Sequence, residues 1–106
     1  MKYLKEVFAN NTLGVDAKIR ILFPYLNAFE KNDSTQKQEA LDLCKIMVEI
    51  HPDEAKPFAM YADFLYQDDK DTAALEQYKK ALEIDKSVYE VWQQIFLILS
   101  EQKRHE

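Results

Sequence analysis

Cys44, His51 and His105 have side chains of the types that act as nucleophiles, proton shuttles or metal ligands, and they are the chain's one cysteine and two histidines. Cys44 lies within an apolar helical pattern with no histidine placed beside it, so we expect a buried, unreactive thiol. His51 precedes Pro52 at the expected end of a helix, where an imidazolium interacts favourably with the helix dipole. His105 belongs to a polar C-terminal tail. The sequence therefore predicts a capping role for His51 and no catalytic role for these residues.

Carboxylates gather at Asp68, Asp69 and Asp71, in a stretch that superficially resembles a calcium-binding loop. The stretch lacks the glycine at the sixth position and the glutamate at the twelfth that such a loop uses, so we expect a solvated turn. A single cysteine also excludes a metal site built from several thiolates. We therefore expect no metal, no cofactor and no enzymatic activity.

The composition describes one small globular domain of 106 residues, with 47% hydrophobic and 31% charged residues. One glycine and three prolines argue against hairpin-rich β folds and against glycine-rich phosphate loops. The net charge of −5 argues against nucleic acid or an anionic membrane as the main partner. No apolar run approaches the roughly 20 residues that membrane insertion requires, and no signal peptide is visible. The lack of disulfides fits a cytoplasmic location without requiring one.

Apolar residues recur with helical spacing along nearly the whole chain, and no segment alternates as a strand would. Residues 2–10 form a short amphipathic pattern, and a second helix starts near Asp16, its expected N-cap. Pro24 lies inside this second pattern and predicts a kink or a late start, because proline removes a backbone hydrogen bond. A polar break at residues 32–35 supplies several capping candidates, Pro52 ends the next helix, and Asp53 can cap the one after it. Six helices joined by short loops make the predicted class all-α.

Two sets of apolar positions recur at a distance of 34 residues, which is the most informative feature of the sequence. The first set lies in the helices expected before Pro52 and before residue 85, and the second set lies in the helices that follow each of them. The matched pairs are Ala40/Ala74, Leu41/Leu75, Cys44/Tyr78, Met47/Ala81, Val48/Leu82, Ile50/Ile84, Phe58/Trp92, Tyr61/Ile95, Ala62/Phe96 and Leu65/Leu99.

With this period the chain resembles the tetratricopeptide repeat (TPR) family, whose 34-residue unit is a helix-turn-helix. A central repeat over residues 55–88 fills all of the family's hallmark positions, with Phe58, Tyr61, Ala62 and Leu65 on the first helix and Ala74, Tyr78 and Ala81 on the second. Small residues at three of these positions allow close packing of neighbouring helices. The resemblance implies antiparallel helix-turn-helix repeats stacked as a short superhelix, an α-solenoid.

The flanking units match the family less well. Residues 15–54 form a degenerate repeat, in which Cys44 replaces an aromatic residue and Met47 replaces a small one. Residues 89–106 form a half repeat with a polar tail, in which Phe96 stands where a small residue is expected. Residues 1–14 form an N-terminal helix or cap, so the chain is expected to be a single TPR-like domain.

The last expected helix is more apolar than a helix that ends a repeat array usually is. Leaving several large apolar side chains in water is costly, since burying each one is worth about 1.5–3 kcal/mol. Three explanations compete: a longer array from which this chain is a segment, self-association through this helix, or a partner helix. The candidate interface consists of Val91, Trp92, Ile95, Phe96, Ile98 and Leu99, with Leu97 beside it.

In the TPR family, a concave groove formed by the first helix of each repeat typically holds a peptide. The resemblance implies a groove lined by Lys56, Ala59, Asp63, Tyr66 and Gln67, by Glu90, Gln93, Leu97, Ser100 and Glu101, and by Arg20, Phe23, Asn27 and Glu30 from the preceding helix. A subclass that grips a terminal carboxylate uses a cationic clamp. This chain has Lys56 but Met60, Glu90 and Gln94 at the matching positions, so that ligand is not expected.

We expect a non-enzymatic scaffold for protein–protein contact, which binds a peptide or a helix of a partner as part of a longer repeat array. The alternative is a small structural domain that forms a homodimer through its apolar C-terminal helix. An accessory domain of an enzyme that lies outside this segment is a third possibility. The sequence leaves the partner, the pathway and the compartment open.

Overall fold

The computed structural model describes residues 2–27, 31 and 33–104, and within them it contains α-helices, one 3-10 helix and no strand. The all-α prediction is therefore confirmed for the described residues. Glu30 and His105, which the sequence placed in a groove and in a tail, lie outside them. The elements in chain order are α1 (Lys2–Ala9), α2 (Val15–Leu22), η1 (Phe23–Tyr25), α4 (Ser34–Ile50), α5 (Ala55–Gln67), α6 (Asp71–Ile84) and α7 (Tyr89–Arg104).

The helix ends follow local capping chemistry, with two corrections to the sequence prediction. Asp33 caps α4 by accepting a hydrogen bond from the backbone N–H of Gln36 at 3.2 Å, as the polar break predicted. Gly14 is the N-cap of α2, so the expected cap at Asp16 is wrong, because Asp16 lies inside the first turn. Glu54 is the N-cap of α5 in place of the expected Asp53, and its side chain makes no capping bond.

Pro24 interrupts the helical pattern, as the sequence predicted, but α2 ends early and the predicted late start is wrong, since α2 begins at Val15. The α-helix stops at Leu22, and the backbone tightens into the 3-10 turn Phe23–Tyr25 around the proline. A proline has no backbone N–H and crowds the preceding turn, so a short 3-10 segment accommodates it with little loss of hydrogen bonding. The first helical pattern of residues 15–54 is consequently broken.

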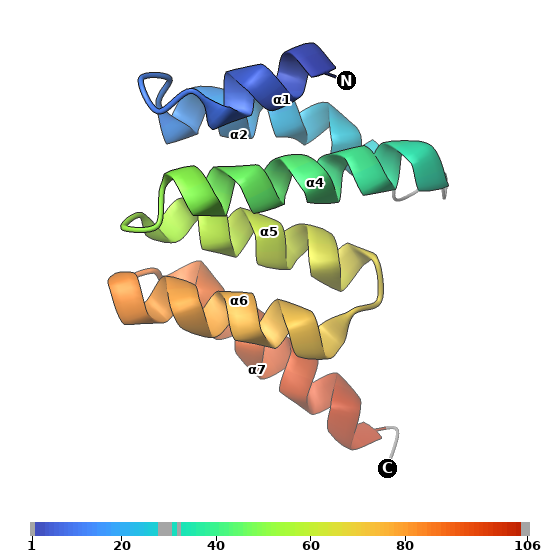
Figure 1. Cartoon of the computed structure of the whole chain (residues 1–106). Coiled ribbons are helices and arrows are strands. Elements are labelled where there is room, and N and C mark those ends of the chain that lie inside the picture. Colours follow the sequence, from blue (N-terminus) through green and yellow to red (C-terminus); the bar gives the residue numbers. More distant parts are fainter. Residues whose placement is uncertain (1, 28–30, 32, 105–106) are drawn as a thin grey trace.

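Neighbouring helices pack side by side, and α4, α5 and α6 lie next to one another with their connecting turns at alternate ends (Figure 1). The described helices form a flat body with principal extents of 43 × 32 × 17 Å. The packing is most extensive between α5 and α6, and α1 packs against α4 across the sequence. The fully buried side chains include Phe8, Leu22, Ala40, Leu43, Cys44, Met47, Ala62, Phe64, Ala74, Ala81 and Ile98.

The turn between α5 and α6 is closed by a left-handed residue. Asp69 has a φ of 61°, and its N–H donates to the carbonyl of Tyr66 at 3.0 Å, while the N–H of Lys70 donates to the carbonyl of Leu65 at 2.9 Å. These two bonds form a Schellman motif that satisfies the last carbonyls of α5. The acidic stretch therefore serves as a helix stop. The carboxylate of Asp68 pairs with Lys37 at 3.2 Å and with Lys70 at 3.0 Å.

Candidate functional site

The candidate interface on α7 divides into an inward and an outward half. Val91 and Ile98 are buried and Ile95 is half-buried, all three within or against the core. The outward half is exposed, with Phe96 at 75% and Trp92 at 50% of their full accessibility. The exposed large apolar side chains of this helix are Tyr89, Trp92, Phe96, Leu97 and Leu99, and we call these five residues the α7 face.

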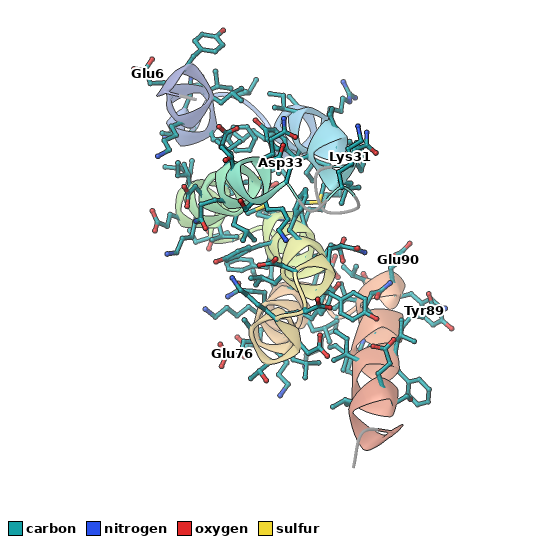
Figure 2. The ribbon with its side chains drawn as sticks, turned by 90° about the vertical axis from the view of Figure 1, so that its right-hand side faces the viewer. Glu6, Lys31, Asp33, Glu76, Tyr89 and Glu90 are labelled. Atoms are coloured by element: carbon teal, nitrogen blue, oxygen red, sulfur yellow. The ribbon has the colours of Figure 1, made fainter. Side chains whose placement is uncertain are left out.

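The α7 face points away from the rest of the molecule. Figure 2 shows α7 at one side of the stack of helices, with Tyr89 at the N-terminal end of α7 directed away from the other helices. A shallow hollow of about 570 Å³ lies on this side, lined by Tyr89, Trp92, Gln93, Gln94, Phe96, Leu97 and Ser100. Every residue that lines it is uncharged, so the hollow suits an apolar side chain of a partner.

Trp92 is held in place by the turn before α7. Its indole Nε1 donates to the backbone carbonyl of Lys86 at 3.1 Å. The turn itself is fixed by Asp85, whose Oδ1 accepts from the backbone N–H of Ser87 at 3.0 Å and from its hydroxyl at 2.6 Å. The ring is thus oriented before any partner arrives, which lowers the entropy cost of binding through it.

Trp92 also borders a second hollow, of about 450 Å³, between α6 and α7. Its other lining residues are Lys79, Leu82, Glu83, Lys86 and Ile95. Trp92 therefore lines two hollows, a position typical of an anchor residue in an interface.

The residues assigned to a concave groove do not line one common hollow in the described structure. Several are already engaged within the chain: Lys56 pairs with Asp16 at 3.0 Å, and Tyr66 donates to the two carboxylate oxygens of Glu101 at 2.8 and 3.0 Å. Ala59 is half-buried. The exposed members of the assigned set are Arg20, Phe23, Asn27, Lys56, Gln67, Glu90, Gln93 and Leu97, of which Gln93 and Leu97 belong to the hollow on α7.

Asp63 is the groove residue whose position differs most from the expectation. Its carboxylate accepts a hydrogen bond from the hydroxyl of Tyr78, a buried residue of α6. Burial raises the pKa of Asp63, and the bond from Tyr78 opposes this by lowering it. Burial together with the neighbouring carboxylate raises the pKa of Tyr78. Asp63 thus links α5 to α6 and is not free to contact a peptide.

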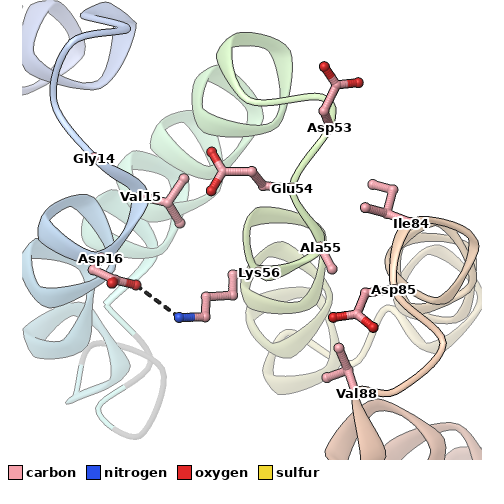
Figure 3. A pocket seen from close by; sticks show the side chains of 10 residues that line it. All are labelled: Gly14, Val15, Asp16, Asp53, Glu54, Ala55, Lys56, Ile84, Asp85 and Val88. Atoms are coloured by element: carbon pink, nitrogen blue, oxygen red, sulfur yellow. Dashed lines mark hydrogen bonds and ion pairs between the residues drawn. The ribbon is translucent and has the colours of Figure 1, made fainter.

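A hollow of about 700 Å³ lies where the α1–α2, α4–α5 and α6–α7 connections meet (Figure 3). It is lined by Gly14, Val15, Asp16, Asp53, Glu54, Ala55, Lys56, Ile84, Asp85 and Val88, so its charged groups are four carboxylates and one amine. Among the residues that the structure describes, no three potential ligands come together as a metal site. The hollow is an acidic depression between turns.

A buried lysine makes a polar cluster that the sequence analysis missed. The Nζ of Lys18 donates to the carbonyl of Asn10 at 2.9 Å and lies 2.8 Å from Nε2 of His51, whose Nδ1 lies 3.1 Å from Glu54. The ring therefore lies between Lys18 and Glu54, and His51 is at the same time the C-cap residue of α4, the position that the sequence predicted for it. Burial lowers the pKa of Lys18, and Glu54 acts in the opposite direction.

The thiol of Cys44 is fully buried, as the sequence predicted. Burial raises the pKa of this thiol, and the nearby Asp63 raises it further. A buried thiol with a raised pKa has little thiolate, which is the reactive form. Cys44 is therefore a packing residue.

No family model matches the chain, and no curated protein sequence matches it. Within the described part of the chain, none of the helices combines the length and apolarity needed to cross a membrane.

Proposed function

We propose that this chain is a non-enzymatic protein–protein interaction module, organised as a TPR-like array in which α2/α4 and α5/α6 form repeats and α7 begins a third. The burial of matched positions supports this arrangement. Cys44 and Tyr78 are both buried, as are Ala40 with Ala74 and Met47 with Ala81, each pair 34 residues apart. Equal burial at a fixed distance is what stacked repeats produce, because each repeat packs on the next in the same way.

The observation that carries the proposal is the contrast between α5 and α7 at matched positions. Phe64 and Ile98 are both fully buried, so the two helices use this position alike. Leu65 is 5% exposed, whereas its counterpart Leu99 is 46% exposed. The side of the helix that is buried in α5 is therefore uncovered in α7, and a bound protein would cover it.

A peptide groove along the first helices of the repeats is the second candidate. It shares Gln93 and Leu97 with the hollow on α7, so a bound segment that reached this hollow would contact both surfaces. The engagement of Asp63 and Tyr66 within the chain favours the α7 face over the rest of the groove.

Site-specific photo-crosslinking in the source cells tests the proposal. A photoreactive amino acid placed at Gln93, beside the α7 face, is expected to yield a discrete crosslinked species. The matched control places the same group at Lys45, an exposed position on α4, and is expected to yield none. Crosslinks of equal intensity from both positions, or none from Gln93, would contradict a specific protein-binding role for this surface.

A further inference from the structure

We propose that the α7 face is covered by a second copy of this chain, whose α7 packs antiparallel to the first about a two-fold axis at Phe96. The inference rests on the proposed function, since it names the partner of the same surface. It follows from the charge, the spacing and the size of the side chains on this helix.

The charge pattern permits the surface to meet itself. Residues 91–100 contain no charged side chain, although 31% of the chain is charged and its net charge is −5. Two copies of an anionic protein repel each other most weakly where an uncharged surface meets its own copy. A hollow that binds a basic partner would be expected to contain carboxylates, and this hollow contains none.

The spacing of the exposed residues fits an antiparallel pair. Tyr89, Trp92, Phe96 and Leu99 follow one another at intervals of three and four residues, as along a coiled-coil seam. With Phe96 on the axis, Trp92 lies opposite the partner's Ser100, so that a large side chain meets a small one. The two Phe96 rings meet each other, and such aromatic pairs are favourable when the rings are offset or edge-to-face.

In a parallel pair, the sizes of the facing side chains and their charges would both be less favourable. Trp92 would meet the partner's Trp92, and Glu90 would lie near the partner's Glu90. In the antiparallel pair, the two Glu90 side chains lie at opposite ends of the interface. The separation of these two carboxylates favours the antiparallel orientation.

A further repeat helix suits this face less well than a second copy does. Ala62 of α5 is fully buried, and α5 and α6 form the most extensively packed pair of helices. The matching position in α7 is Phe96, whose ring would hold apart any helix that approached α7 as α6 approaches α5. Phe96, the residue that departs from the repeat pattern, therefore lies at the centre of the proposed interface.

The exposed area predicts a weak dimer. Tyr89, Trp92 and Phe96 are 68%, 50% and 75% exposed, which corresponds to roughly 400 Å² of aromatic surface for each copy. A standard interface buries about 800 Å² for each partner, so we expect a dissociation constant in the micromolar range.

Sedimentation equilibrium of the full chain, from about 1 µM to about 1 mM, tests for the second copy. We expect a monomer–dimer equilibrium that Phe96→Glu weakens by at least about 30-fold. Tyr3→Glu is the matched control, because Tyr3 of α1 is 74% exposed, and it is expected to leave the equilibrium unchanged. A monomer at every concentration would overturn the proposal, as would a dimer that persists in Phe96→Glu or oligomers that grow without limit.

Disulfide crosslinking tests the orientation. In the antiparallel pair, residue 93 of one copy lies next to residue 100 of the other, whereas two residues 93 are about 9 Å apart along the axis and two residues 100 about 12 Å. A disulfide requires closer approach, so a mixture of Gln93→Cys and Ser100→Cys proteins is expected to crosslink and each protein alone is not. Crosslinking of Gln93→Cys with itself would overturn the antiparallel arrangement. The buried Cys44 does not interfere.

The inference and the proposed function fail in different ways. If the chain is monomeric but the photoreactive group at Gln93 crosslinks to a different protein, the second copy is wrong and the protein-binding role stands. If the chain is monomeric and Gln93 crosslinks to nothing, both are wrong.

Discussion

The pair formed by Asp63 and Tyr78 places a titratable group inside the contact between α5 and α6. Because burial raises the pKa of Asp63, the folded state binds a proton more readily than the unfolded state does. The contribution of Asp63 to stability is therefore fully present below its unfolded pKa of 3.8 and is lost as the pH rises through the higher folded pKa.

This linkage makes the effect of Tyr78→Phe dependent on pH. The hydroxyl of Tyr78 stabilises the carboxylate form, so its removal should cost about 1–3 kcal/mol near neutral pH, where this form is more favoured than at pH 4 and has lost its donor. The loss should be smaller near pH 4. Urea unfolding at both pH values measures it, and in an Asp63→Asn background the difference between them should shrink. Equal losses at both pH values would show that the hydroxyl does not act through Asp63.

The left-handed backbone of Asp69 predicts a stabilising substitution. Asp69→Gly should raise the free energy of unfolding by about 0.5–1 kcal/mol, because glycine adopts a positive φ without a steric penalty. Asp69→Ala should lower it, since alanine has neither this freedom nor a polar side chain that favours the region. Thermal unfolding of the two variants provides the comparison, and a stabilising Asp69→Ala would contradict the assigned backbone conformation.

At the scale of the helices, a matched pair of substitutions distinguishes a covered position from an uncovered one. Ala62→Phe on α5 should destabilise the fold by about 1–3 kcal/mol or more, because Ala62 is fully buried. Phe96→Ala at the equivalent position on α7 should change the stability of the monomer by no more than about 0.5 kcal/mol. Urea unfolding at a concentration at which the chain is monomeric measures both. Similar losses at the two positions would mean that Phe96 packs within its own chain.

The order and type of the helices were predictable from the sequence because helical periodicity, the break at Pro24 and the polar stretch before Ser34 are all local signals. The division of α7 into a buried and an exposed half was not predictable, because helical periodicity shows where apolar residues lie but not which side of the helix a neighbouring helix covers. The bond between Asp63 and Tyr78 depends on how α5 meets α6, and no spacing encodes that. Lys18 offered a signal that was overlooked: it lies three residues after Val15 and four before Leu22, on the stripe that becomes buried.

At the scale of the whole molecule, Lys18 fastens the N-terminal helices to the turn between α4 and α5. Its amine joins the carbonyl of Asn10, after α1, to His51, which ends α4. This link closes one end of a flat molecule whose opposite end is formed by α7. The two ends can therefore be perturbed separately.

Lys18→Met should loosen the N-terminal helices without affecting α7. The variant keeps an apolar stem but leaves the carbonyl of Asn10 and Nε2 of His51 without this donor, so we expect local opening of residues 2–22 to become easier by about 1–3 kcal/mol. Amide hydrogen exchange measures the change segment by segment. Lys56→Met is the control, since its exposed ion pair with Asp16 should contribute little. Faster exchange throughout the molecule would contradict a local link.

The position of Trp92 also gives the protein an optical property. It is the chain's one tryptophan, and it lies half-exposed on the α7 face with its indole nitrogen bonded to Lys86. Any partner that covers this face removes water from the indole ring, and the fluorescence of the unmodified protein then shifts to shorter wavelength. The intrinsic fluorescence of Trp92 therefore measures how much of the α7 face is covered, so a titration with a candidate partner needs no added label.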